Sequence, residues 1–114
     1  MVLFRKSCEL EDRRSATRFA PDPDVSCLVL DRDMGCWRPA SVRDISLTGI
    51  ALLAAEPFDK ENVLTIELRL DKRGFVRKFL IEVRHADICC PNDAWLHGCQ
   101  FTHPLSEYEL QLLL

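Results

Sequence analysis

Residues 63–85 read VLTIELRLDKRGFVRKFLIEVRH, and this stretch decides the fold class. From Val63 to Leu70, leucine or isoleucine stands at every second position, and the positions between are mostly polar. A period of two is typical of a strand with one buried face. Residues 71–74 supply a polar turn whose glycine can adopt a positive φ, and Phe75 to His85 returns as a second strand. The stretch therefore predicts an antiparallel hairpin.

Short apolar runs separated by turn-forming residues continue this pattern on both sides of the hairpin. Such a pattern is typical of an all-β sandwich or barrel. We expect further strands at Val25–Leu30, Ala40–Ile45, Gly49–Ala54 and Trp95–Phe101. Together with the hairpin they predict an all-β fold, a six-stranded antiparallel β-barrel.

The end of the chain has a different pattern. Ser106 is followed three residues later by Glu109, which is the spacing of a capping box. Leu105 and Leu110 stand where a hydrophobic staple would place them. We therefore expect a C-terminal α-helix that packs across one end of the barrel.

The first part of the chain lacks strand patterning. Residues 1–24 are rich in charge, and Pro21 and Pro23 bias their neighbours toward extended conformations. We expect a flexible N-terminal arm over residues 1–24, followed by the barrel and helix over residues 25–114, in a single domain.

The composition is that of an average soluble globular protein, with 47% hydrophobic and 29% charged residues in a chain of 114. The formal net charge is −3. This argues against a protein that coats a nucleic acid polymer, because such proteins carry an overall basic field. Any anionic ligand must therefore be bound locally.

The sequence gives no sign of export. It has no run of about 18 or more apolar residues, so we expect no membrane insertion. Residues 1–10 carry charges in place of a signal peptide's apolar stretch. We expect a cytoplasmic protein, a monomer or weak homodimer, with reduced thiols. Its cysteines are Cys8, Cys27, Cys36, Cys89, Cys90 and Cys99.

Two short motifs carry the residue types that point to a function. Residues 13–18, in the predicted arm, read Arg-Arg-Ser-Ala-Thr-Arg and contain an Arg-x-x-x-Arg pattern. Residues 44–49, between the second and third predicted strands, read Asp-Ile-Ser-Leu-Thr-Gly. Either motif alone is weak evidence, but their order, separation and placement on a β framework are jointly specific.

With both motifs, the sequence resembles the PilZ domain family from Arg13 to its end, including residues 83–85, residues 98–101 and the closing helix. The resemblance implies a PilZ-like split barrel that binds the bacterial second messenger cyclic diguanylate (c-di-GMP) and is not an enzyme. It also implies signalling through an effector protein, unidentified by this sequence, in the control of motility, biofilm or exopolysaccharide. No cofactor is expected.

The chemistry of cyclic diguanylate fits the two motifs, because the ligand carries two phosphodiester charges and two guanines. Arg14 and Arg18 can fork onto phosphate oxygens or onto guanine O6 and N7, and can stack on a base. Asp44 can accept from the N1 and N2 hydrogens of guanine, an edge that adenine does not present. Ser46 would offer its hydroxyl to a phosphate or base. Gly49 would permit a tight turn and a close backbone approach.

Arg13 stands directly before the first motif. In similar receptors, an extra arginine at this place tends to accompany an intercalated pair of ligand molecules, so we expect Arg13 to contribute to such a pair. The arm would be loose without ligand, and folding it over the barrel would expose a surface to the effector.

Two other classes of function stay open. The chain could be a PilZ-like adaptor that binds only protein, as family members without the arginines do. It could also be a metal or redox protein, although it has no Cys-x-x-Cys pair and adjacent cysteines on a strand point to opposite faces. The possible zinc donors are Cys89, Cys90, His97, Cys99 and His103.

Three ring-bearing residues outside the motifs have simpler explanations. Trp37 and Trp95 could stack on a guanine, but tryptophan in a small barrel more often fills the core, where we expect both. His85 ends a predicted strand, and we expect it to be structural or to line a pocket.

Overall fold

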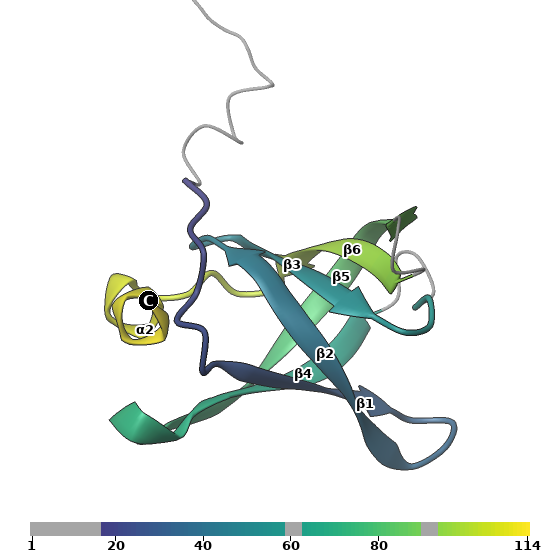
Figure 1. Cartoon of the computed structure of the whole chain (residues 1–114), viewed down its shortest axis with the longest axis horizontal. Coiled ribbons are helices and arrows are strands. Elements are labelled where there is room, and N and C mark those ends of the chain that lie inside the picture. Colours follow the sequence, from purple (N-terminus) through teal and green to yellow (C-terminus); the bar gives the residue numbers. More distant parts are fainter. Residues whose placement is uncertain (1–16, 59–62, 90–93) are drawn as a thin grey trace, which may run out of the picture.

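The computed structural model describes residues 17–58, 63–89 and 94–114. The strands among these residues close into an antiparallel barrel in the order β1-β2-β3-β6-β5-β4, with a helix beside it (Figure 1). The predicted six-stranded antiparallel barrel with a C-terminal helix is therefore confirmed. The elements are β1 (Ser26–Asp31), β2 (Cys36–Ile45), β3 (Gly49–Ala54), β4 (Val63–Leu70), the 3₁₀ helix η2 (Asp71–Arg73), β5 (Phe75–Cys89), β6 (Ala94–Phe101) and α2 (Glu107–Leu113).

Two strands are longer than predicted. β2 begins at Cys36 in place of Ala40, and β5 ends at Cys89 in place of His85. The added part of β2 contains Pro39, and proline cannot donate to a strand ladder. The pairing with β3 begins two residues after this proline, so Pro39 lies where β2 is paired with β1 alone.

The predicted alternation of β4 is confirmed. Ile66, Leu68 and Leu70 are fully buried in the barrel, and the side chain of Arg69 between them is exposed. Each buried aliphatic side chain contributes roughly 1.5–3 kcal/mol through removal of its surface from water. The other strands add to the same core. Its largest fully buried apolar side chains are Ile45, Ile50, Leu52, Ile66, Leu68, Leu70, Ile81, Val83 and Leu113.

The turn of the β4–β5 hairpin also holds the helix. Asp71 begins the 3₁₀ helix, and Gly74 ends it at φ 65°, the positive φ that the sequence predicts. The Arg73 guanidinium donates to the carbonyl oxygens of Gln111, at 3.3 Å, and Leu112, at 2.9 Å. Because the last carbonyls of a helix have no partner within it, this arginine stabilises the end of α2.

The start of α2 is capped as predicted. The Ser106 Oγ accepts from the Glu109 N–H at 3.0 Å, and the Glu109 carboxylate accepts from the Ser106 N–H at 2.9 Å. Leu105 and Leu110 are buried in the same cluster as the barrel core, so the helix closes that core. No helix within the described ranges is long and apolar enough to cross a membrane.

The described end of the predicted arm lies against the barrel. Phe19 and Ile45 exchange two backbone hydrogen bonds, of 2.8 and 2.9 Å. Asp22 is buried, and its N–H donates to the Leu113 carbonyl at 2.8 Å. These residues are therefore part of the folded domain. The flexibility predicted for residues 1–16 stays a prediction, because they lie outside the described residues.

The prediction that both tryptophans fill the core was wrong for Trp37. Its ring is 37% exposed, and the Lys78 Nζ lies 5.8 Å from the ring centroid, where a cation and an aromatic face attract each other. Trp95 is half-buried and is not part of the core cluster either, so the prediction fails for both rings. Strand alternation places Trp37 on the outer face of β2, which the sequence prediction of this strand did not include.

Candidate ligand-binding site

The second motif forms the connection between β2 and β3. The Ser46 N–H donates to the Gly49 carbonyl at 2.9 Å. The Ser46 Oγ accepts from the N–H groups of Gly49, at 3.0 Å, and Thr48, at 3.3 Å. A serine hydroxyl bonded in this way fixes the backbone of a turn. Since Ser46 is fully buried, its role here is structural, and a contact between its hydroxyl and a ligand stays a prediction.

Gly49 is required by a close contact and not by a positive φ, which among the described glycines is found at Gly35 and Gly74. A Cβ atom on Gly49 would lie 2.9 Å from the Cys99 carbonyl oxygen of β6 and 3.8 Å from a terminal nitrogen of Arg18. A side chain would therefore push β3 from β6 or fill the space beneath the arginine.

Arg18 and Asp44 form an exposed ion pair beside this glycine. The Arg18 Nη1 donates to the Asp44 Oδ1 at 2.6 Å, and the two side chains are 54% and 27% exposed. The backbone bridge between Phe19 and Ile45 sets their spacing, because each is the chain neighbour of one partner. Exposed pairs of this kind contribute about 0–1 kcal/mol, so a ligand can replace the contact at little energetic cost.

Four of the six predicted site residues thus meet where β2 ends and β3 begins. The other two, Arg13 and Arg14, lie outside the described residues, so their contacts stay predictions. The arrangement offers a carboxylate acceptor, a guanidinium donor and a surface without a side chain between them. The four residues that meet are Arg18, Asp44, Ser46 and Gly49.

Two further polar residues border the site. Gly49 pairs with Gln100 on β6, and Gln100 pairs with Glu82 on β5. The Arg84 Nε and Nη2 donate to the Gln100 Oε1 at 3.1 and 2.7 Å. The resemblance to the PilZ family covers Arg84 and Gln100, but the sequence predicted no ligand contact for either, because their nearness to Gly49 depends on the pairing of β3 with β6.

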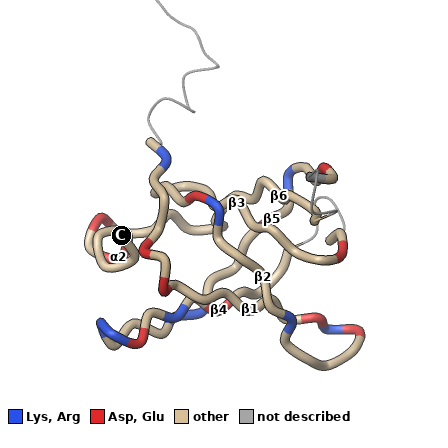
Figure 2. Tube along the Cα trace, in the orientation of Figure 1, with Lys and Arg blue, Asp and Glu red and all other residues tan. Residues whose placement is uncertain are grey.

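The charge of the described surface is mixed. Basic and acidic positions are interspersed along the described trace (Figure 2). Binding of an anion therefore depends on individual arginines and on how each is paired.

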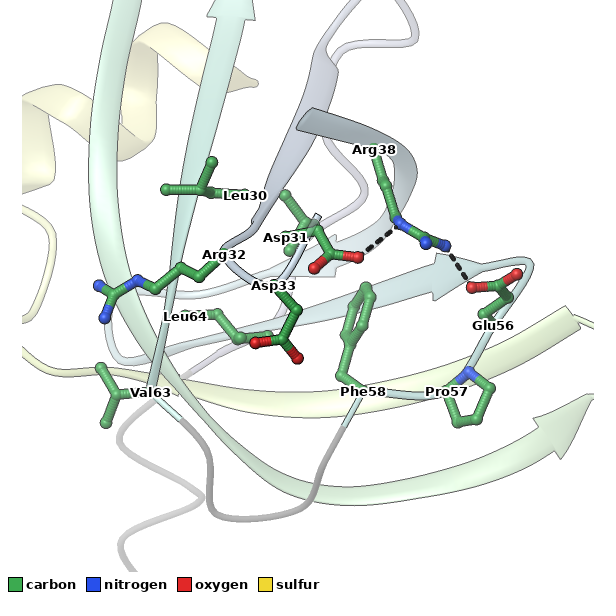
Figure 3. A pocket seen from close by; sticks show the side chains of 11 residues that line it. Leu30, Asp31, Arg32, Asp33, Arg38, Glu56, Pro57, Phe58, Val63 and Leu64 are labelled. Carbon is green, nitrogen blue, oxygen red and sulfur yellow. Dashed lines mark hydrogen bonds and ion pairs between the residues drawn. The ribbon is translucent and has the colours of Figure 1, made fainter. Parts of the chain in front are cut away.

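A pocket of about 320 Å³ lies near the other end of β2 (Figure 3). There the Arg38 Nε forms an ion pair with the Asp31 Oδ2 at 2.9 Å, and the Arg38 Nη1 donates to the Glu56 carboxylate. The hydrogen bond to Glu56 is the main cause that raises the pKa of Arg38. This arginine faces two carboxylates, which leaves it poorly suited to an anionic ligand.

His97 is fully buried and contacts Phe58, a residue that lines this pocket. Its ring stacks on Phe58 with centroids 4.2 Å apart, and its Nε2 accepts from the Phe58 N–H at 3.0 Å. Burial lowers the pKa of His97. The backbone carbonyls of Leu52 and Trp95 act in the opposite direction and raise the pKa, but less than burial lowers it. Neither forms a hydrogen bond with Nδ1, which has no partner among the described residues. The ring is therefore neutral and structural.

The buried cysteines Cys27 and Cys99 do not support thiol chemistry. Burial raises the pKa of Cys27 to about 12, and burial likewise raises the pKa of Cys99 to about 12. A thiol with so high a pKa stays protonated, and the thiolate is the reactive form. The described ranges hold no group of three or more His, Cys, Asp or Glu side chains placed to bind a metal.

The sequence model of the PilZ domain matches residues 12–114, which is most of the chain. The chain belongs to the PilZ domain family. A comparison with curated proteins gave no match.

Solved structures of PilZ proteins share the fold. The PilZ domain of YcgR from Escherichia coli, solved with c-di-GMP, superposes with a TM-score of 0.67 at 20% identity, over 88% of this chain and 87% of that one. The complex of MrkH from K. pneumonia with c-di-GMP gives 0.67 at 19% identity, over 89% of this chain and 49% of that one. The Bacillus subtilis inhibitor of motility MotI/DgrA gives 0.65 at 18% identity, over 89% and 47%. At these identities the likeness shows the fold alone.

Proposed function

We propose that this PilZ domain is a receptor for cyclic diguanylate and acts by binding, without catalysis. The observation that carries the proposal is the exposed Arg18–Asp44 pair beside Gly49, at the junction of the two sequence motifs. Two solved PilZ structures with the same fold contain c-di-GMP, which supports this choice of ligand.

In the proposed complex, the ligand separates the ion pair. Asp44 turns its carboxylate to the N1 and N2 hydrogens of a guanine, and Arg18 forks onto a phosphate or onto the O6 and N7 edge. Arg14, four positions before Arg18, supplies a second guanidinium. Once Arg18 leaves it, the Asp44 carboxylate would repel a phosphate. Binding is favourable because one ligand offers both side chains a partner, an anionic group for Arg18 and hydrogen-bond donors for Asp44.

The response to the ligand would pass through the backbone that carries Arg18. Thr17 and Phe19 line a groove of about 300 Å³ whose other wall is formed by Leu110 and Leu114 of the helix region. Moving Arg18 away from Asp44 moves both neighbours and so reshapes this groove. We propose that an effector protein of the motility, biofilm or exopolysaccharide machinery reads this change in the cytoplasm.

Arg13 would set the stoichiometry. An intercalated pair of ligand molecules carries four phosphate charges, and Arg13 would raise the number of arginines that face them from two to three, beside Arg14 and Arg18. A titration that ends at two ligands per protein supports this part of the proposal, and a ratio of one contradicts it.

The proposal is tested by calorimetric titration of cyclic diguanylate into the wild type, Arg14→Ala and Asp44→Ala. Cyclic diadenylate is the control ligand, because it keeps the phosphates and lacks the guanine edge. Asp71→Ala is the matched control variant, since it removes a carboxylate that is 78% exposed on the β4–β5 turn.

We expect micromolar or tighter binding of cyclic diguanylate by the wild type and the control variant, and no binding of cyclic diadenylate. Each site variant should weaken binding by about tenfold or more, because a hydrogen bond to a charged group contributes about 1.5–3 kcal/mol. Folded wild-type protein that ignores cyclic diguanylate would reject the receptor and favour the adaptor that binds only protein.

A further inference from the structure

The two strands that flank the β3–β6 pair are irregular at the same level of the barrel. The register of β2 with β3 shifts between Val42 and Asp44, and the register of β5 with β6 shifts between Val83 and His85. Each shift leaves one extra residue, and both extra residues are arginines, Arg43 and Arg84. Such bulges redirect a side chain and occur often beside functional sites.

The residues that follow the two bulges lie in one row across four strands. Asp44 pairs with Ala51, Ala51 pairs with Gly98, and Gly98 pairs with His85. Asp44 and His85 therefore lie at opposite ends of this row, with the small residues Ala51 and Gly98 between them. Arg84 directly precedes His85, and its hydrogen bonds to Gln100 place its guanidinium beside the next row, which contains Gly49. The His85 ring covers Gly98, since a Cβ there would lie 2.3 Å from its Cε1.

The Arg84 guanidinium is held toward the candidate site. Its Nε and Nη2 both donate to the Gln100 Oε1, and Gln100 is the direct neighbour of Gly49 across β3 and β6. With the Gln100 oxygen engaged by Arg84, the pair presents N–H groups to its surroundings. The array therefore suits a ligand atom that accepts hydrogen bonds.

Arg84 also keeps its charge available. Its ion pair with Glu82 is long, at 3.7 Å, and no hydrogen bond joins the two side chains. They are 52% and 36% exposed, so water screens the pair and a ligand can compete with Glu82. By contrast, Asp44 on the other side of the surface presents acceptor atoms. A ligand lying across Gly49 thus meets acceptors on one side and donors on the other.

We propose that Arg84, positioned by Gln100, is a further ligand-contacting residue that donates to acceptor atoms of the bound nucleotide. The inference rests on the proposed receptor function. The acceptor is a phosphate oxygen or the O6 and N7 edge of a guanine, which share this chemistry. Arg84 and Arg18 would then bind the ligand from opposite sides of Gly49.

The test is calorimetric titration of cyclic diguanylate into the wild type, Arg84→Met, Arg84→Lys and Gln100→Ala. Arg69→Met is the matched control, because it removes an exposed arginine from β4 that pairs with neighbouring carboxylates. Thermal unfolding of every variant separates folding from binding. A 7-deaza form of the ligand, which lacks guanine N7, distinguishes the base edge from the phosphate.

We expect Arg84→Met to weaken binding by about tenfold or more, since a charge-assisted fork is lost. Arg84→Lys should recover only part of the affinity, because an ammonium group cannot fork onto the ligand and onto Gln100 together. Gln100→Ala should weaken binding less than Arg84→Met. In the double variant Arg84→Met/Gln100→Ala, the second substitution should cause no further loss of affinity, because Gln100 acts through Arg84.

If Arg84 contacts N7, the wild type should bind the 7-deaza ligand more weakly than the normal ligand. The Arg84→Met variant should then bind the two ligands equally well. If Arg84 contacts a phosphate, the loss of affinity from the 7-deaza ligand and the loss from Arg84→Met should add. Either result, contact with N7 or contact with a phosphate, supports the inference. Normal binding by a folded Arg84→Met variant, with or without a lower melting temperature, makes the Arg84–Gln100 pair a structural sheet contact and overturns the inference alone. If the wild type does not bind cyclic diguanylate, both the proposed receptor function and this inference are overturned.

Discussion

Each end of β2 lies beside an arginine bonded to carboxylates, and the two surroundings differ. Arg38 lies between Asp31 and Glu56 next to a pocket of about 320 Å³. Arg18 has Asp44 as its partner and lies over Gly49, on a surface of small residues. The pocket offers the larger concave surface, but the charge of Arg38 is already balanced by two carboxylates. The comparison teaches that pairing of charge, and not depth, distinguishes the end of the barrel that suits an anionic ligand.

The largest expected effect concerns the stability of the pocket end. His97→Ala removes the ring stacked on Phe58 and leaves the Phe58 N–H without its acceptor. We expect the free energy of unfolding to fall by about 2–4 kcal/mol, measured by urea denaturation. His103→Ala, at an exposed position, is the control and should stay within about 0.5 kcal/mol of the wild type. A folded His97→Ala variant that lost ligand affinity would contradict the distinction between the two ends, because the pocket end would then take part in binding.

A smaller effect on stability, joined to an effect on binding, is expected at the motif end. Gly49→Ala places a Cβ 2.9 Å from the Cys99 carbonyl oxygen, so β3 and β6 must shift. We expect a loss of about 1–3 kcal/mol in the free energy of unfolding and a clear loss of ligand affinity. Thr48→Ala, in the same turn and exposed, is the control for both measurements. Unchanged affinity in Gly49→Ala would show that the surface under Arg18 need not be bare.

The smallest effect is the dependence of stability on pH. Burial lowers the pKa of His97 below the usual value of about 6.5. Below pH 6.5 the unfolded chain binds a proton at this residue that the folded barrel does not bind. The free energy of unfolding should therefore fall as the pH drops from about 6.5 toward the folded-state pKa, by at most about 1.4 kcal/mol per pH unit.

Urea denaturation between pH 7 and 5 measures this slope. His97→Gln should flatten it, and His103→Gln should leave it unchanged. Equal slopes in the wild type and His97→Gln would contradict a buried neutral ring at the pocket end.

Local sequence predicted the strands well and the relations between distant strands poorly. The alternation in β4 and the turn at Gly74 depend on neighbours in the chain, and both were predicted. Trp37 was placed wrongly, because the predicted strand began at Ala40 and left out the part of β2 that directs this ring outward.

The candidate site shows the same limit. The motifs predicted that Arg18, Asp44 and Gly49 act together, and the structure brings them together. Nothing in the spacing of Arg84 and Gln100 could place them beside Gly49. That neighbourhood arises from the pairing of β3 with β6, about 50 residues apart in the chain, and from a bulge in β5 that local propensity does not predict.

The most direct test of the central claim is a titration of cyclic diguanylate into Arg18→Ala and Arg38→Ala, side by side with the wild type. Both variants lose one arginine that is paired with carboxylate beside the same strand, Arg38 with two carboxylates and Arg18 with one. The account predicts that Arg18→Ala weakens binding by about tenfold or more while Arg38→Ala stays within about twofold of the wild type. Equal losses in the two variants, or a larger loss in Arg38→Ala, would contradict it.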